Sequence, residues 1–281
     1  MFKRFGIIMC AGFIVASFTP FLFAQSDIEI DLLKYWSPAD NVTAAKKNME
    51  NAVNPLLDLF GFTAGGGLYN TADVHGVLGF DVGIKLTGMM VGDEQKPTLV
   101  GMPSGLQNGP LGNESVVPVP VLQASVGLVG NLEVIGRYFT FPIGKENSAN
   151  GNVTLLGIGA KYGLIQVFGL PKVAVVGAYH RLTVPEDFHF EGVNNMSLAL
   201  VASYSFPALA TIYGGAGIDY SSLTVKLPDP YPQLDAFTKQ NFRGNVGMKF
   251  TPIPLVPLFV NIDYNFGVVK GLSAGLGISV R

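Results

Sequence analysis

Alternating apolar and polar residues fill most of the chain after Gly76 and predict β-strands. The clearest copy is segment 78–87, where even-numbered residues are apolar and odd-numbered ones are glycine, charged or hydroxyl-bearing. Successive side chains of a strand point to opposite faces, so this segment has one apolar and one polar face. About ten segments repeat the pattern. They are 76–91, 117–129, 131–141, 152–164, 172–184, 195–206, 209–224, 240–251, 257–267 and 270–280.

Most of these segments are long enough for a tilted strand to cross a bilayer. Short connections such as 207–208 alternate with long polar ones such as 92–115 and 226–238, an arrangement typical of outer-membrane barrels. We therefore predict an all-β fold: an antiparallel, up-and-down transmembrane β-barrel of ten to twelve strands, with fourteen less favoured. The two additional strands would come from 62–72 and from within 92–115.

Charged residues within the strands fall on the polar parity. A charge facing hydrocarbon costs roughly 2–4 kcal/mol at the bilayer midplane, so this parity should face the lumen. Segment 172–184 is the exception, because Arg181 shares the parity of Val173 and Val175. The lining could act as a selectivity filter or as a salt-bridge network, and the narrow interior of a ten-strand barrel favours the network. The expected lumen-lining residues are Asp81, Lys85, Glu133, Arg137, Lys161, Asp219, Arg243, Lys249 and Asp263.

The N-terminal part divides into two expected segments ahead of a barrel at 63–281. Lys3 and Arg4 precede an apolar stretch, which predicts a secretory signal peptide at 1–24 cleaved after Ala24. An uncleaved anchor helix is the alternative. Within 25–62, apolar residues at helical spacing predict one amphipathic helix, with Pro55 as a possible bend. This helix would either plug the barrel or cap its periplasmic rim.

Composition excludes several functional classes. Only 14% of the residues are charged and the formal net charge is −2, whereas nucleic-acid-binding domains carry a basic footprint. Cys10 is the single cysteine, so a mature chain without the signal has no disulfide, thiolate chemistry or cysteine metal site. We expect no cofactor. Export without later membrane helices points to the outer membrane of a two-membrane bacterium, with outer-membrane lipid and the barrel-assembly machinery as partners.

Three histidines provide the few candidates for catalysis: His75, His180 and His189. His75 follows Asp73, yet we interpret it as a polar residue at the rim of the first strand. His189 lies in an acidic loop that could bind a metal weakly, although a solvated loop is the commoner explanation. A lipid-modifying enzyme would need a histidine within hydrogen-bond reach of a serine or carboxylate at the lipid interface. We expect no enzyme and no metal site.

Three stretches carry a family resemblance: 67–81, 117–127 and 133–138. Together they resemble an uncharacterised family of exported bacterial outer-membrane β-barrel proteins, a resemblance that covers most of the mature chain and implies a barrel without a known activity. A looser likeness is to the long-chain fatty-acid transporter family, which is similar in its N-terminal plug and barrel. That family's Asn-Pro-Ala motif is replaced here by 54–56, and its fourteen strands exceed our count. Arg281 stands where outer-membrane barrels commonly end in an aromatic residue.

Two functions follow as hypotheses. The favoured one is a plugged channel or binding barrel for small apolar solutes, suggested by glycines on the polar parity and by the helix before the barrel. The alternative is a non-transporting barrel with a structural or surface-contact role. A lumen densely filled with paired charges would favour the alternative, and an open lumen would favour transport.

Overall fold

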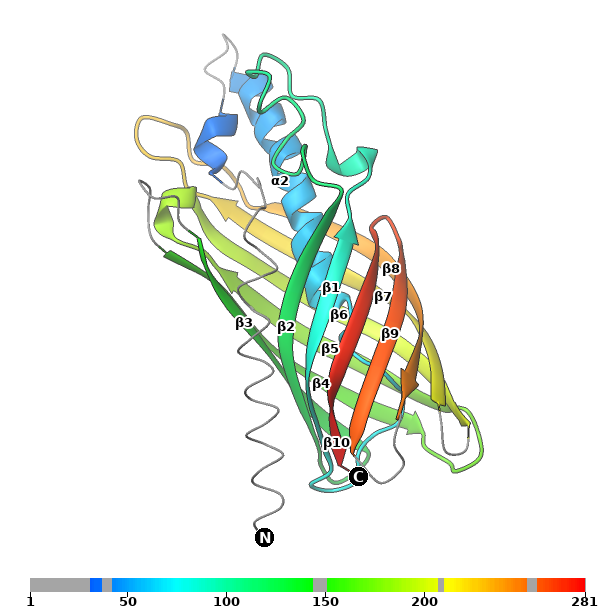
Figure 1. The fold of residues 1–281 in the computed structure, drawn as a ribbon. Coiled ribbons are helices and arrows are strands. Elements are labelled where there is room, and N and C mark those ends of the chain that lie inside the picture. Colours follow the sequence, from blue (N-terminus) through cyan, green and yellow to red (C-terminus); the bar gives the residue numbers. More distant parts are fainter. Residues whose placement is uncertain (1–30, 37–41, 144–150, 207–209, 252–256, 281) are drawn as a thin grey trace.

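The computed structural model describes residues 31–36, 42–143, 151–206, 210–251 and 257–280, and Figure 1 shows its fold. The expected signal peptide at 1–24 and the residues expected to start the helix, 37–40, lie outside the described residues. So do the tight turn expected at 207–208 and the C-terminal Arg281. In the part of the chain that is described, no helix combines the length and apolarity needed to cross a membrane.

Ten strands form a closed antiparallel barrel in the order β1-β10-β9-β8-β7-β6-β5-β4-β3-β2. The strands are β1 (Phe80–Met90), β2 (Val116–Gly127), β3 (Leu132–Ile143), β4 (Gly151–Ile165), β5 (Lys172–Thr183), β6 (Phe190–Phe206), β7 (Ala210–Val225), β8 (Phe237–Phe250), β9 (Leu258–Gly267) and β10 (Lys270–Val280). β1 pairs with β10 from Phe80↔Val280 to Met90↔Lys270, which closes the ring. Closure satisfies the edges that an open sheet would expose.

The expected all-β barrel of ten to twelve strands is confirmed at its lower count: the described residues form ten strands, so a count of twelve is wrong for them, and fourteen is rightly less favoured. Segment 62–72 forms the last turn of a helix and an irregular stretch, because it packs inside the barrel and does not extend the wall. Segment 92–115 contains the short helix η2 (Asp93–Gln95) and no described strand. The largest boundary error is in β6, which begins at Phe190 and not at 195.

Side-chain alternation places apolar residues on the outer wall. In β4, Leu156 and Ile158 are each 64% exposed, whereas Lys161 is 2% exposed. Side chains also alternate at the end of β5, where His180 is buried inside the barrel and Arg181 is exposed outside it. Arg181 is thus a charged residue on the outer face, as its parity predicts. The period-two pattern therefore separates an apolar exterior from a polar interior around the ring.

The two ends of the barrel differ. At the end that we call the loop end lie connections 91–115, 184–189, which contains η3 (Glu186–Phe188), 226–236 and the two-residue connection 268–269. At the opposite end, the turn end, lie connections 128–131 and 166–171. β1 begins and β10 ends at this turn end (Figure 1). The short connection 268–269 is thus an outlier at the loop end.

Helix α2 (Val42–Gly65) enters the barrel from the loop end, with the 3-10 helix η1 (Leu32–Tyr35) beside its beginning (Figure 1). It continues through Pro55 without a break in the helix assignment. Met49, Val53 and Leu56 are fully buried in an apolar cluster. The cluster also contains residues of the loop-end connections and of the strand ends next to them. Beyond Gly65, residues 66–79 lead to the start of β1 and are here called the luminal segment. The expected boundary at 62/63 falls inside α2, and the barrel wall begins at Phe80.

Candidate functional site

All nine charged residues expected in the lumen lie on the inner side of the barrel wall and are at most 8% exposed. Each has a partly or largely exposed neighbour on its strand. On β1, for example, Asp81 and Lys85 face inward while Val82 is 44% exposed. The nine are Asp81, Lys85, Glu133, Arg137, Lys161, Asp219, Arg243, Lys249 and Asp263.

Arg137 of β3 binds the C-terminal end of α2. Its Nη1 donates to the carbonyl oxygens of Thr63, at 3.3 Å, and of Ala64, and its Nη2 donates to the carbonyl of Gly66 at 3.1 Å. The last carbonyls of a helix have no partner within the helix and carry a partial negative charge. The guanidinium therefore satisfies these carbonyls and fixes the helix end to the β3 wall.

Arg243 of β8 approaches the same helix end from the other side of the ring. Its Nε lies 2.8 Å from Asp219 Oδ2 on β7, forming a buried ion pair. A Cβ on Gly65 would overlap Asp219 Oδ1 and lie 2.6 Å from Arg243 Nη2. Gly65 therefore lets α2 lie directly against this pair, which a larger residue would have to displace.

Asp58 anchors α2 about two turns before Gly65, nearer the loop end, and is fully buried. Its Oδ1 lies 2.7 Å from Lys239 Nζ and accepts a hydrogen bond from Asn241 Nδ2 at 2.8 Å. Gln95 of η2 donates to Oδ2 at 3.0 Å. The Asp58 carboxylate thus links α2 to β8 of the wall and to connection 91–115.

The luminal segment is fixed to several strands by hydrogen bonds. Tyr69 Oη donates to Asn245 Oδ1 at 2.6 Å, and Lys161 Nζ donates to the carbonyl of Asp73 at 2.7 Å. The Asp73 carboxylate forms an ion pair with Lys172. The segment is therefore attached, through side-chain and backbone groups, to more than one strand of the wall.

The predicted residues Lys85 and Asp263 form hydrogen bonds with neutral side chains of the wall. Lys85 Nζ donates to Asn261 Oδ1 at 2.7 Å. The carboxylate of Asp263 accepts from Tyr213 Oη at 3.0 Å and from Asn265 Nδ2 at 2.7 Å. The polar interior is therefore a connected network, in which neutral side chains supply many of the hydrogen bonds.

His75 lies between two carboxylates near the turn end, where it is 4% exposed. Its Nδ1 is 2.8 Å from Glu133 Oε2 and its Nε2 is 3.0 Å from Asp81 Oδ1. Each carboxylate also has a lysine: Lys161 lies 3.0 Å from Glu133, and Lys249 lies 3.2 Å from Asp81. Burial alone would lower the pKa of His75, but its hydrogen bonds to Asp81 and Glu133 outweigh burial and raise it. His75 thus lies near the start of the first strand, as expected of a rim residue, but the luminal segment carries it inside the wall, where it is buried.

Ser279 lies 3.4 Å from His75 Nε2, so serine, histidine and Glu133 have the residue types of a hydrolytic triad. Asp81 is closer to the same nitrogen, at 3.0 Å. A general base needs a free nitrogen to accept the serine proton. With a carboxylate at each ring nitrogen, His75 is held as a hydrogen-bond donor on both sides, and this arrangement does not activate Ser279.

The other two histidines occupy different environments. His180 is 1% exposed, and neither of its ring nitrogens has a hydrogen-bond partner among the described residues. His189 Nδ1 lies 2.8 Å from Asp31 Oδ1, between connection 184–189 and η1. Within the described residues, no cluster of three or more His, Cys, Asp or Glu could hold a metal ion.

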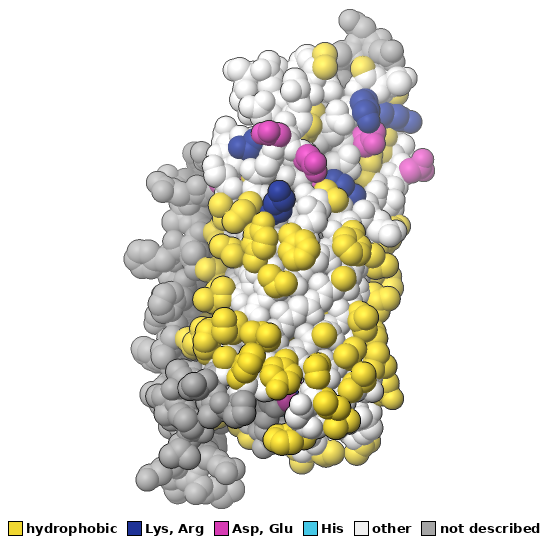
Figure 2. Space-filling model, turned by 90° about the vertical axis from the view of Figure 1, so that its right-hand side faces the viewer, with side chains coloured by type: hydrophobic (Ala, Val, Ile, Leu, Met, Phe, Trp, Pro, Cys, Tyr) yellow, Lys and Arg dark blue, Asp and Glu magenta, His cyan; other side chains and the backbone are white. Residues whose placement is uncertain are grey.

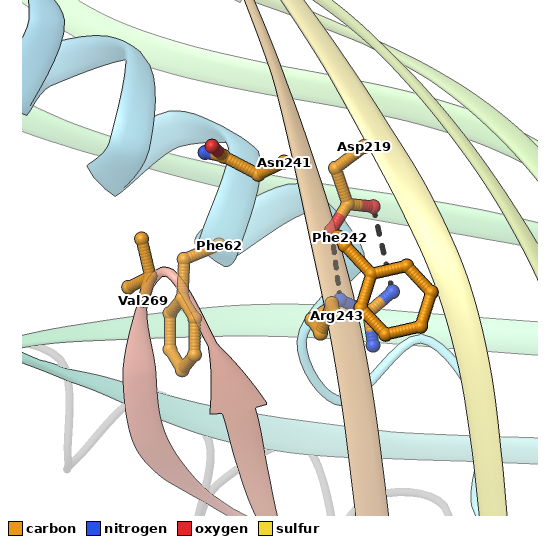
Figure 3. A pocket seen from close by; sticks show the side chains of 6 residues that line it. All are labelled: Phe62, Asp219, Asn241, Phe242, Arg243 and Val269. Atoms are coloured by element: carbon orange, nitrogen blue, oxygen red, sulfur yellow. Dashed lines mark hydrogen bonds and ion pairs between the residues drawn. The ribbon is translucent and has the colours of Figure 1, made fainter.

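A small pocket, with room for about one water molecule, lies in the barrel wall where β9 is too short to cover β8. β8 pairs with β9 only from Arg243↔Gly267 to Phe250↔Val260, so its upper part extends beyond the β9–β10 hairpin. Figure 3 shows Phe62 of α2 lying between the helix and the hairpin tip that carries Val269, with the Asp219–Arg243 pair beside it. The lining residues are Phe62, Asp219, Asn241, Phe242, Arg243 and Val269.

Sequence reasoning missed the partners that α2 and the luminal segment supply. Asp58 follows Leu57 on a helix and gives no local signal of a barrel partner. Tyr69 lies in segment 62–72, which is interpreted from the sequence as a possible strand, and Asp73 directly follows that segment. The one available signal was the set of glycines on the polar parity, such as Gly127, which leaves room for a chain inside the barrel.

Comparison with known proteins gives a family and several distant structural similarities. A family model described as "Family of unknown function (DUF6588)" matches residues 2–100 and 92–280. No curated protein matches the chain at a significant level. The long-chain fatty-acid transporter likeness therefore stays a resemblance.

The structural similarities are to β-barrels. The translocator domain of autotransporter NalP from Neisseria meningitidis is 14% identical, with a TM-score of 0.46, over 82% of this chain and 98% of that one. The N-terminal β-barrel domain of Pseudomonas aeruginosa OprF is 15% identical, with a TM-score of 0.33, over 53% and 97%. Ail of Yersinia pestis, solved with the heparin analogue sucrose octasulfate, is 11% identical, with a TM-score of 0.30, over 72% and 95%. At these scores the similarities carry no functional argument.

Proposed function

The chain belongs to this family of unknown function, DUF6588, and on that premise we propose that it is an outer-membrane β-barrel kept closed by its own N-terminal segment. Outer-membrane lipid and the barrel-assembly machinery are the partners that this role requires. In this proposal the loop end faces outward, because outer-membrane barrels have long outer loops and short periplasmic turns.

The apolar outer wall supports the membrane location. Figure 2 shows hydrophobic side chains covering the wall, while most Lys, Arg, Asp and Glu side chains gather toward the loop end. Leu156, Ile158 and Phe242 on this wall are each at least 60% exposed. Soluble monomers rarely expose continuous apolar patches larger than a few hundred Å². Lipid is the solvent in which such a wall is stable.

The observation that carries the closed state is the double attachment of the α2 end. Arg137 on β3 holds its terminal carbonyls, and the Arg243–Asp219 pair packs against Gly65. In the ring order, four strands separate β3 from β8 in either direction. The helix end is therefore held between opposite walls, where it blocks the axis. Of the two initial hypotheses, this dense lumen favours the non-transporting barrel with a structural or surface-contact role.

Conductance in planar bilayers tests the closed state. We expect the wild-type protein to show no steady conductance, and the double variant Arg137→Ala/Arg243→Ala to show frequent openings because the helix end loses both attachments. Arg181→Ala is the matched control, since Arg181 is exposed on the outer wall. A steady open conductance of the wild-type protein would contradict the proposal.

The wall pocket does not favour the other hypothesis, the binding of small apolar solutes. Phe62, Phe242 and Val269 line it beside the Asp219–Arg243 pair, but it has room for about one water molecule. A fluorescent single-chain amphiphile added to the purified protein tests this role, and we expect no binding. Binding that is reduced in Val269→Trp but not in Val268→Trp would show that the pocket opens to a solute, because Val269 is 6% exposed and Val268 is 45% exposed.

We also propose that the protein is not an enzyme. The engaged nitrogens of His75 support this, because they leave Ser279 without a base. A fluorophosphonate probe, which reacts with activated serines, should leave the folded protein unlabelled. Labelling that disappears in Ser279→Ala would overturn this part of the proposal.

A further inference from the structure

The beginning of the described chain lies at the loop end, in contact with two separate connections. Asp31 Oδ1 lies 2.8 Å from His189 Nδ1 in connection 184–189. The rings of Trp36 and Tyr231, the latter in connection 226–236, pack edge to face with their centroids 6.1 Å apart. These contacts fix residues 31–36 over the mouth of the barrel.

The first turns of α2 lie at the same end. Asn48 Nδ2 donates to the carbonyl of Val100 in connection 91–115 at 2.8 Å. Val42 is 59% exposed, and Lys47 and Glu50 form an exposed ion pair at 3.0 Å. The helix therefore begins in solvent among the long connections and ends inside the barrel.

The luminal segment completes the crossing to the turn end. The backbone of His75 and Gly76 passes so close to Gly127, the last residue of β2, that a Cβ on Gly127 would overlap it. Leu78 N donates to the carbonyl of Gly127 at 3.0 Å, and Gly127 N donates to the carbonyl of Gly79 at 2.8 Å. The chain has thus passed once through the whole barrel before β1 begins.

We propose that this chain threads its N-terminal segment through its own barrel, so that residues 31–36 and 42–47 are displayed on the cell surface. The inference rests on the proposed outward orientation of the loop end. Since an exported chain reaches the outer membrane from the periplasm, residues beyond the far mouth must cross as the barrel assembles around them. The attachments of Asp58, Gly65 and Tyr69 to the wall then keep the segment in place.

Labelling of single cysteines on intact cells tests the threading. The only native cysteine is Cys10, so a Cys10→Ala background carries one introduced cysteine at a time. Ala44→Cys probes the start of α2, Ser104→Cys probes connection 91–115, and Val129→Cys probes the turn end; all three positions are exposed. The reagent is a maleimide on a long polyethylene glycol chain, which does not cross the outer membrane.

We expect Ala44→Cys and Ser104→Cys to react on intact cells, and Val129→Cys to react only after the outer membrane is permeabilised. Reaction of Ser104→Cys without Ala44→Cys would overturn the threading and leave the orientation of the barrel intact. Reaction of Val129→Cys alone would instead overturn the proposed orientation. Reaction of none of the three on intact cells would overturn both, provided that all react after permeabilisation.

Discussion

Arg137 and Arg243 reach the same end of α2 from opposite walls of the barrel. Arg137 donates to the carbonyls of Thr63 and Gly66 at 3.3 and 3.1 Å, and Arg243 pairs with Asp219 at 2.8 Å beside Gly65. One arginine is neutralised by a carboxylate and the other by the negative end of a helix. Two like charges can therefore approach the axis of a narrow barrel, because each faces its own negative group.

Removing the carboxylate of this pair should strongly destabilise the barrel. Asp219→Ala leaves Arg243 buried without its partner, a loss that typically costs about 3–5 kcal/mol. We expect a decrease of this order in the free energy of unfolding, measured by urea titration of the protein folded in vesicles. Adding Arg243→Met should restore part of it, because the unpaired charge is removed as well.

Glu191→Ala serves as the control, because Glu191 pairs with Lys226 on the exposed surface. This variant should unfold like the wild-type protein. An Asp219→Ala variant as stable as the control would show that the pair does not hold the wall together.

Gly127 should not tolerate even a methyl group. A Cβ there would overlap the backbone oxygens of His75 and Gly76, and backbone atoms of the luminal segment cannot move aside as a flexible side chain can. We expect Gly127→Ala to lower the free energy of unfolding by about 1–3 kcal/mol, as overpacked sites do. Gly136→Ala is the matched control, because a Cβ there meets nothing within 4 Å. Equal stability of the two variants would contradict the close passage of the segment.

The sequence predicts the wall of this barrel well because the wall follows a local rule. Side chains alternate between the two faces of a strand, so whether a residue is odd or even in the strand decides whether it points inward or outward. Leu155 and Lys161 accordingly point inward and Leu156 points outward. The same rule places the nine charged residues inward without any knowledge of their partners. The additional strand predicted at 62–72 was wrong because a short segment with scattered apolar residues suits a strand and a helix end equally.

The partners within the lumen depend on register and threading, which no local pattern encodes. Asp58 meets Lys239 and Asn241 across a large separation in sequence, and His75 meets Glu133 only because the chain returns through the barrel. The direction in which α2 enters was likewise not predictable, since an amphipathic helix fits either mouth. The shortness of connection 268–269 was visible, but the pocket beside it requires the position of Phe62.

The cluster around His75 predicts a loss of stability as the pH rises. The pKa of His75 is raised in the folded state by Asp81 and Glu133, with Lys161 and Lys249 as the other charged groups around it. Its contribution is therefore complete below the unfolded pKa of about 6.5 and is lost as the pH rises through the higher folded value. Urea midpoints measured across this range should fall with pH in the wild-type protein and change less in His75→Gln. The same pH slope in both would exclude His75 as the titrating group.

Introducing a charged residue on the outer wall tests whether this surface faces lipid or water. Ile158→Arg places an arginine on β4 at a position that is 64% exposed, and Val100→Arg places one in connection 91–115 at a position that is 77% exposed. In water neither change would matter, whereas in a bilayer an arginine near the midplane costs about 2–4 kcal/mol. We expect Ile158→Arg alone to reduce the free energy of unfolding from vesicles by this amount. If both variants unfold like the wild-type protein, the wall does not face hydrocarbon, because exposure at the two positions is similar and only the surrounding solvent separates them.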